Sequence, residues 1–144
     1  MKTIHLIFGT HNSQPVGNFD SVMENVYQQA YKPFISIMNN FQDIPVTLHY
    51  SGVLFEWLEE KHPEFLMVIE EMVKRKQVEL LSGGYYEPVL SLIPNSDKLG
   101  QIESLTTYIR SHFGKRPRGS WVTERVWEPN YASILQNCGI EYIF

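Results

Sequence analysis

The stretch VTLHYSGVLFEWLEEKHPEFLMVIEEMVKRKQVELLSGG, residues 46–84, decides the fold. It opens with the apolar run 46–50 and closes with a second run at 78–81, each ended by serine and glycine, and both runs are typical of buried strands. Between them lie two helical patterns, over 53–60 and 63–75. A strand, a helical crossover and another strand predict a parallel α/β unit.

The same alternation continues on both sides of this unit. Pro33 lies inside the helical pattern that precedes it and should kink or divide that helix. Asn95 or Ser96 is a suitable N-cap for the helix that follows. The remaining elements are predicted as a buried strand over 3–9, a helix over 21–40, a helix over 95–112, a strand over 119–122, a helix over 129–137 and a strand from 141. We therefore predict an α/β fold of parallel strands with helical crossovers.

Composition narrows the class of protein. The 144 residues are 43% apolar and 19% charged, which fits one domain, or a piece of one, with a real core. A net charge of -4 argues against a nucleic-acid partner. We see no signal peptide and no apolar run long enough for a membrane span, so we expect no membrane partner and a cytoplasmic location. Cys138, the single cysteine, is expected to be a small buried hydrophobe.

Side chains able to do chemistry follow each predicted strand. In parallel α/β barrels the reactive groups lie just beyond the carboxyl ends of the strands, so these groups should converge on one rim. The alternative is that such loops are polar in any case. The side chains are, strand by strand, His11, Asn12 and Gln14, then His49 and Ser51, then Glu87, then Thr123, Glu124 and Arg125.

Glu124 is the strongest catalytic candidate. It lies between apolar strand residues and two tryptophans, Trp121 and Trp127, which is a poor setting for a solvated surface carboxylate. The adjacent Arg125 could hold it ionised, and an ionised carboxylate in an aromatic site suits attack on an anomeric carbon. The alternative is a buried structural pair of Glu124 with Arg125.

The other candidates have weaker signals. Glu87 could bind sugar hydroxyls or orient the nucleophile, or it could cap backbone amides. His11 could hydrogen-bond a hydroxyl or a carboxylate, or be structural. His49 lies within a strand run and is expected to be a core or satisfied polar group. No helix or cysteine cluster has metal-ligand spacing, and no glycine-rich phosphate loop is present, so we expect neither a metal nor another cofactor.

Three segments together resemble a known family. Residues 11–15, 84–90 and 121–129 are similar to the first three conserved regions of family 57 of the glycoside hydrolases. The likeness is nearest to its 4-α-glucanotransferase and α-amylase members and runs along essentially the whole chain. The motif Thr123-Glu124-Arg125-Val126-Trp127 is its most specific part, whereas the segment that contains His11 would be weak alone.

The resemblance implies an incomplete (β/α)7 barrel that acts on α-1,4-glucans with a retaining mechanism. It makes Glu124 the nucleophile and assigns the acid and base steps to an aspartate from a later strand. The expected partner is an α-glucan or maltooligosaccharide, and the oligomeric state stays open. The substrate-binding rim that it implies comprises His11, Gln14, Glu87, Trp121 and Trp127.

Two departures from the family pattern matter. Ser13 stands where the family usually has a second histidine, which weakens one contact. The aspartates of this chain are Asp20, Asp43 and Asp97, and none follows a predicted strand. We therefore predict that residues 1–144 form part of a catalytic barrel domain whose acid lies beyond the chain, and that they are inactive alone.

Two alternatives remain open at this stage. The chain could be a catalytically incomplete fragment that binds glucan without turnover. It could also belong to a metal-dependent, deacetylase-like barrel, which would need an Asp-Asp pair near the first strand and a His-x-x-x-His motif after a later one; we find neither.

Overall fold

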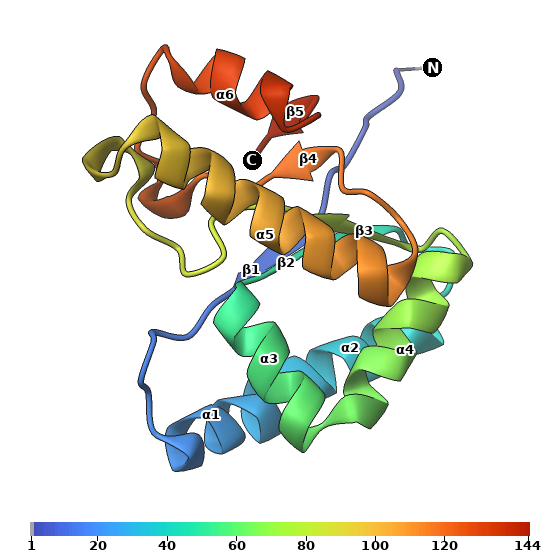
Figure 1. The fold of residues 1–144 in the computed structure, drawn as a ribbon. Coiled ribbons are helices and arrows are strands. Elements are labelled where there is room, and N and C mark those ends of the chain that lie inside the picture. The colour runs from blue at the N-terminus through green and yellow to red at the C-terminus, as the bar shows by residue number, and fades with distance from the viewer. Residues whose placement is uncertain (1) are drawn as a thin grey trace.

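The structure, a computed structural model, describes residues 2–144 and alternates strands with helices (Figure 1). The strands all run parallel to their neighbours. The elements are β1 (Gly9–Asn12), α1 (Asp20–Val26), η1 (Tyr27–Tyr31), α2 (Lys32–Asn40), β2 (Val46–Tyr50), α3 (Gly52–Lys61), α4 (Pro63–Lys74), β3 (Val78–Leu81), η2 (Leu90–Leu92), α5 (Asn95–Phe113), β4 (Gly119–Ser120), η3 (Thr123–Arg125), α6 (Tyr131–Asn137) and β5 (Tyr142–Ile143). The predicted parallel α/β architecture is confirmed.

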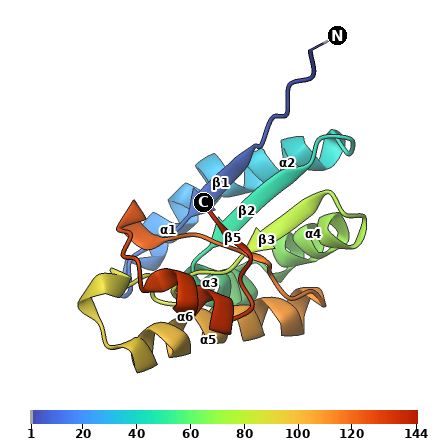
Figure 2. The ribbon, with the colours of Figure 1, turned by 90° about the horizontal axis from the view of Figure 1, so that it is seen from above.

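The strands form one parallel array in chain order. One sheet has the order β1-β2-β3 and a second pairs β4 with β5. A parallel bridge between Ser82 and Ser120 joins the two, with Trp121 N–H donating to the Ser82 carbonyl at 2.8 Å. Figure 2 shows that β1, β2 and β3 run in the same direction. Residues that follow these strands therefore lie at the same edge of the sheet, which we call the rim.

Helices cover one face of the β1-β2-β3 sheet. Figure 1 shows α1 to α4 on that face, and β4, β5 and α6 on the other side. β2 is buried along nearly its whole length, as expected of a central parallel strand. One core cluster joins β2 and β3 to the helices α1 to α5, and a second lies between α5 and α6. Across residues 2–144, each helix is too short or too polar to span a membrane.

The first strand lies later than predicted. We expected a buried strand over 3–9, whereas β1 spans Gly9–Asn12, and Ile4 and Leu6 are 90% and 86% exposed. The reason is the partner strand: β2 begins at Val46, directly after Pro45, so its pairing with β1 ends where Thr47 N–H donates to the Phe8 carbonyl. Apolar composition without a partner strand does not make a strand.

The helix predicted over 21–40 is divided, as Pro33 indicated. A π-helical segment, η1, separates α1 from α2, and Pro33 falls in the first turn of α2. Proline lacks an N–H and clashes with the carbonyl four residues earlier, and the wider π turn removes that conflict.

Three predicted boundaries are wrong. The N-cap of α5 is Pro94, because the Asn95 side chain accepts from Lys98 Nζ at 3.2 Å and Ser96 donates to Asp97. β4 ends at Ser120 rather than 122, because the chain turns into η3. The last helix begins at Tyr131, two residues later than predicted.

Candidate active site

The site begins with two histidines on neighbouring strands. Parallel register places His11 of β1 opposite His49 of β2, and their Nδ1 atoms lie 2.9 Å apart. The two rings are stacked with centroids 4.9 Å apart. His49 is completely buried, as expected, but its Nε2 has no hydrogen-bond partner. His49 is therefore a core residue, as predicted, that also contacts the rim residue His11.

Glu87 completes this cluster from the loop after β3. Its Oε2 lies 3.6 Å from His11 Nε2, and its Oε1 lies 3.8 Å from His49 Nδ1. Burial, opposed by a hydrogen bond from Ser13 and reinforced by the charge of Glu124, raises the pKa of Glu87 to about 6. Oε1 is buried without a hydrogen-bond partner, so this carboxyl group has capacity for a ligand.

Trp121 covers one face of His11. Its ring stacks on the imidazole with centroids 4.3 Å apart and an interplanar angle of 12°. The His49 and Trp121 rings are themselves 6.2 Å apart, so the three rings form one compact group that gives the rim an aromatic wall. Gly83 makes room for this stack, since a Cβ there would lie 2.7 Å from His49 Nε2.

Glu124 lies on a turn beyond β4 rather than within a strand. It belongs to η3, is solvent-exposed and has a positive φ of 55°. Burial lowers the pKa of His11, and the Glu124 carboxylate partly offsets this, as it also acts on Glu87. Glu124 comes three residues after Trp121, whose ring stacks on His11, so the turn that carries it follows directly on the cluster.

Arg125 does not hold Glu124 in the way we expected. Within residues 2–144, no ion pair joins the two side chains, and both are exposed. The predicted alternative of a buried pair is wrong for the same reason: the turn of η3 carries both residues out of the strand, with φ of 55° at each.

Two predicted rim residues are engaged elsewhere. Gln14 donates to Tyr31 Oη at 2.8 Å and accepts from Asn18 at 2.7 Å, which ties its amide to the first helical segments. Trp127 packs edge-on against Tyr131 with 48% of its surface exposed. The structure brings His11, Glu87 and Trp121 together, with Glu124 on the turn that follows Trp121, and it joins neither Gln14 nor Trp127 to this group.

The cluster of His11, His49 and Glu87 combines metal-ligand side chains that no spacing in the sequence indicated. One ligand-type atom each from His11, His49 and Glu87 lies within 4.8 Å of the others, which is a grouping able to hold a metal ion. The three residues come from three chain segments, so no local motif marks them. Only the register of β1 against β2, which pairs His11 with His49, could have indicated that these residues meet.

The aspartates lie away from strand ends, as predicted. Asp20 opens α1 and accepts from Trp57 Nε1 at 3.3 Å, and Asp97 lies in the first turn of α5. Asp43 is exposed in the turn before β2. Among the described residues, no aspartate stands on the rim with Glu124.

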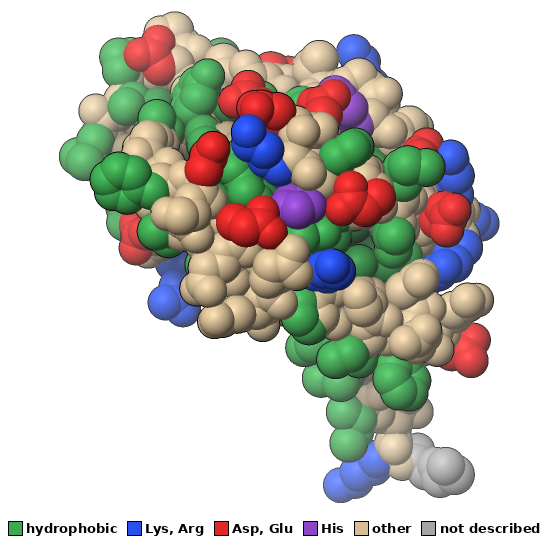
Figure 3. All heavy atoms as spheres, turned by 90° about the horizontal axis from the view of Figure 1, so that it is seen from below, with side chains coloured by type: hydrophobic (Ala, Val, Ile, Leu, Met, Phe, Trp, Pro, Cys, Tyr) green, Lys and Arg blue, Asp and Glu red, His purple; other side chains and the backbone are tan. Residues whose placement is uncertain are grey.

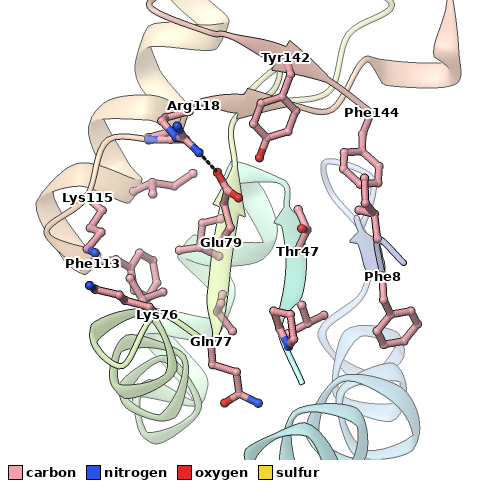
Figure 4. A pocket seen from close by; sticks show the side chains of 18 of the residues that line it. Phe8, Thr47, Lys76, Gln77, Glu79, Phe113, Lys115, Arg118, Tyr142 and Phe144 are labelled. Carbon is pink, nitrogen blue, oxygen red and sulfur yellow. Dashed lines mark ion pairs between the residues drawn. The ribbon is translucent and has the colours of Figure 1, made fainter. Parts of the chain in front are cut away.

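A separate cavity of about 900 Å³ lies toward the opposite end of the strands. Figure 4 shows Thr47 and Glu79 facing it from β2 and β3, with Tyr142 and Phe144 on its far wall and an ion pair between Arg118 and Glu79. Conserved chemistry of parallel barrels takes place at the carboxyl ends, and this cavity includes the amino ends of β2 and β3. The rim around His11 is therefore the better candidate site.

The fold and site define a class: a parallel α/β domain with histidines in the last residues of its strands and carboxylates just beyond them, as in barrel enzymes. Comparison of the sequence makes this specific. The profile of Glycosyl hydrolase family 57 matches residues 7–144, and the chain belongs to that family.

Curated relatives agree with this assignment. The chain is 46% identical over 142 residues to alpha-amylase 1 of Dictyoglomus thermophilum, and 46% identical over 143 residues to the 4-alpha-glucanotransferase of Thermococcus litoralis. Each match covers 99% of this chain but only 21% and 22% of the relatives, respectively. The chain therefore spans about a fifth of the length of these proteins.

Solved structures support the fold. The 4-alpha-glucanotransferase from Thermococcus litoralis superimposes with a TM-score of 0.92 over 95% of this chain and 22% of its own. A family 4 carbohydrate esterase from Streptomyces lividans, 12% identical, matches with a TM-score of 0.59 over 96% of this chain and 61% of its own. The second likeness shows the shared fold alone. The predicted portion of a family 57 barrel is confirmed.

Proposed function

We propose that this chain supplies the nucleophile of a retaining glycoside hydrolase or 4-α-glucanotransferase that acts on α-1,4-glucans. The observation that carries the proposal is the exposed Glu124, which lies three residues after Trp121, whose ring stacks on the His11 imidazole beside Glu87. The names of the relatives, alpha-amylase and 4-alpha-glucanotransferase, support the choice of substrate.

In the proposed reaction, Glu124 attacks the anomeric carbon while an acid protonates the departing glycosidic oxygen. The bond to that oxygen breaks as the bond to the Glu124 carboxylate forms, which gives a glycosyl ester. The former acid then removes a proton from water or from a sugar hydroxyl, and that oxygen displaces Glu124. Water gives hydrolysis and a sugar hydroxyl gives transfer.

The other rim residues are proposed to bind the sugar. His11 is neutral near pH 7 because burial lowers its pKa, so its imidazole can donate and accept hydrogen bonds. Glu87 offers a carboxyl oxygen without a protein partner. The indole of Trp121 adds an apolar wall next to both. Gln14 and Trp127 are proposed as outer contacts, since neither is joined to the cluster.

We propose that residues 1–144 are part of the catalytic barrel domain and that the acid is contributed by chain beyond Phe144. This is supported by the aspartates, which lie at helix starts and in a turn. A cytoplasmic location stays a prediction from the sequence. A fragment that binds glucan without turnover is the remaining alternative for the isolated chain.

Product analysis of the whole protein on maltotriose tests the function. Transfer yields longer oligosaccharides, whereas hydrolysis yields glucose and maltose alone. Glu124→Gln should reduce either activity by more than about 1,000-fold, because a covalent step is lost. Glu128→Gln, a neighbouring carboxylate just before α6, is the matched control and should keep activity. Full activity in Glu124→Gln would refute the proposal.

A further inference from the structure

The cluster of His11, His49 and Glu87 contains buried polar atoms without hydrogen-bond partners, namely His49 Nε2 and Glu87 Oε1. His11 Nδ1 and His49 Nδ1 face each other at 2.9 Å, so one must donate and the other accept. A neutral imidazole has one ring nitrogen with a lone pair that can bind a metal ion. Glu87 Oε1 lies 3.8 Å from His49 Nδ1 and has no hydrogen-bond partner.

These donor atoms have the spacing of a metal site. Zinc bonds of about 2.0–2.1 Å in tetrahedral geometry set neighbouring ligand atoms roughly 3.3 Å apart. The histidine nitrogens at 2.9 Å and the nitrogen-to-oxygen distance of 3.8 Å bracket that value, and the three residues can each offer one donor atom within 4.8 Å of the others. Only small side-chain shifts are needed to meet one ion.

The surroundings favour a transition-metal ion and leave it accessible. Two imidazoles and one carboxylate suit Zn²⁺ or a similar ion better than Ca²⁺ or Mg²⁺, which prefer oxygen. His49 is fully buried, whereas the side chains of His11 and Glu87 are 30% and 12% exposed. One side of the cluster therefore opens to solvent, where an ion can enter and keep a water ligand.

We propose that His11, His49 and Glu87 form a binding site for one Zn²⁺-class ion. Binding needs no net proton loss from the histidines, because the proton shared between the two Nδ1 atoms can move to Nε2 of its own ring. Where the proposed function holds, His11 and Glu87 also bind sugar, so the ion and a glucan exclude each other and the ion acts as an inhibitor.

Calorimetric titration of the 144-residue chain with Zn²⁺, together with the visible spectrum of the Co²⁺ form, tests the site. We expect one ion per chain and the intense bands of low-coordinate Co²⁺. Glu87→Gln and His49→Gln should each weaken binding by more than about 100-fold, beyond the 10- to 100-fold that loss of a supporting residue costs. Circular dichroism checks folding, and Glu87→Gln, at a partly exposed position, serves if His49→Gln does not fold.

A surface cluster provides the matched control. Figure 3 shows acidic side chains gathered around a histidine on the face formed by α1 to α4. On these helices, His62 lies 2.7 Å from Glu24 and 3.2 Å from Glu64, so it is the obvious competitor for an adventitious ion. His62→Gln should leave Zn²⁺ binding unchanged.

The outcomes separate the two proposals. Absence of Zn²⁺ binding, binding retained in Glu87→Gln, or binding lost in His62→Gln overturns the metal site. Maltohexaose should weaken Zn²⁺ binding if the rim also binds sugar. If the variants behave as expected but maltohexaose has no effect, the metal site stands and the sugar-binding role of His11 and Glu87 fails.

Discussion

His11 Nδ1 lies 2.9 Å from the Nδ1 of the fully buried His49 on the adjacent parallel strand. This contact fixes the Nδ1 edge of the His11 ring, and stacking of Trp121 at 4.3 Å covers one of its faces. The position of His11 therefore depends on the buried His49, and changes in the packing around His49 should affect the site.

Gly83→Ala should destabilise the chain by about 1–3 kcal/mol, the usual cost of overpacking. The added Cβ would lie 2.7 Å from His49 Nε2 and 3.2 Å from the Trp121 carbonyl oxygen, so the stack must shift. Urea unfolding monitored by tryptophan fluorescence measures the effect.

Gly100→Ala is the control for this substitution. Gly100 lies in α5, and nothing is within 4 Å of a Cβ placed there. The variant should be more stable by roughly 0.5–1 kcal/mol, because alanine favours helix more than glycine does. If Gly83→Ala proves as benign as Gly100→Ala, the described packing around His49 is wrong.

The backbone at Glu124 is expected to be strained. Its φ of 55° is unfavourable for any residue with a Cβ. Glu124→Gly should therefore be more stable than Glu124→Ala by about 1 kcal/mol. The same pair at Glu103, inside α5, should show the reverse order. Equal stabilities of the two Glu124 variants in urea unfolding would argue against a strained turn.

Cys138 should be chemically inert in the folded chain. It is 1% exposed, and burial is the main cause that raises its pKa to about 11. At pH 8 the thiolate is then scarce, and an aromatic disulfide reagent should react more than about 100-fold faster with the chain in denaturant. Rapid labelling of the native chain would contradict the predicted role as a buried hydrophobe.

The 144-residue chain should not turn over maltooligosaccharides. Loss of general acid catalysis typically costs about 100- to 10,000-fold in rate. An α-glucosyl fluoride needs no protonation of its leaving group, so its cleavage should suffer less. Robust turnover of maltooligosaccharides by this chain would show that an acid lies within it.

Much of the fold was predictable because its signals are local. The bounds of β2 and β3 are those of two short apolar runs, each closed by serine and glycine. The failure at β1 has a different cause. The run from Ile4 to Phe8 is just as apolar, but pairing depends on where β2 begins, and Pro45 is far away in the sequence.

The site was predictable only in part for a similar reason. His11, Glu87 and Glu124 were found because each follows a strand predicted from the sequence, although His11 lies within β1 itself. The role of His49 depends on register between two strands, which places its ring beside that of His11. Likewise, the hydrogen bonds that hold Gln14 against Tyr31 come from helix packing, which no local pattern describes.

The identity of the nucleophile is tested most directly by covalent trapping. The whole protein is treated with 5-fluoro-α-glucosyl fluoride, whose glycosyl ester breaks down slowly, and its peptides are analysed by mass spectrometry. The account predicts one glycosyl adduct on the peptide that contains Glu124, and none in Glu124→Gln. An adduct on Glu87, or unchanged labelling of Glu124→Gln, would contradict it.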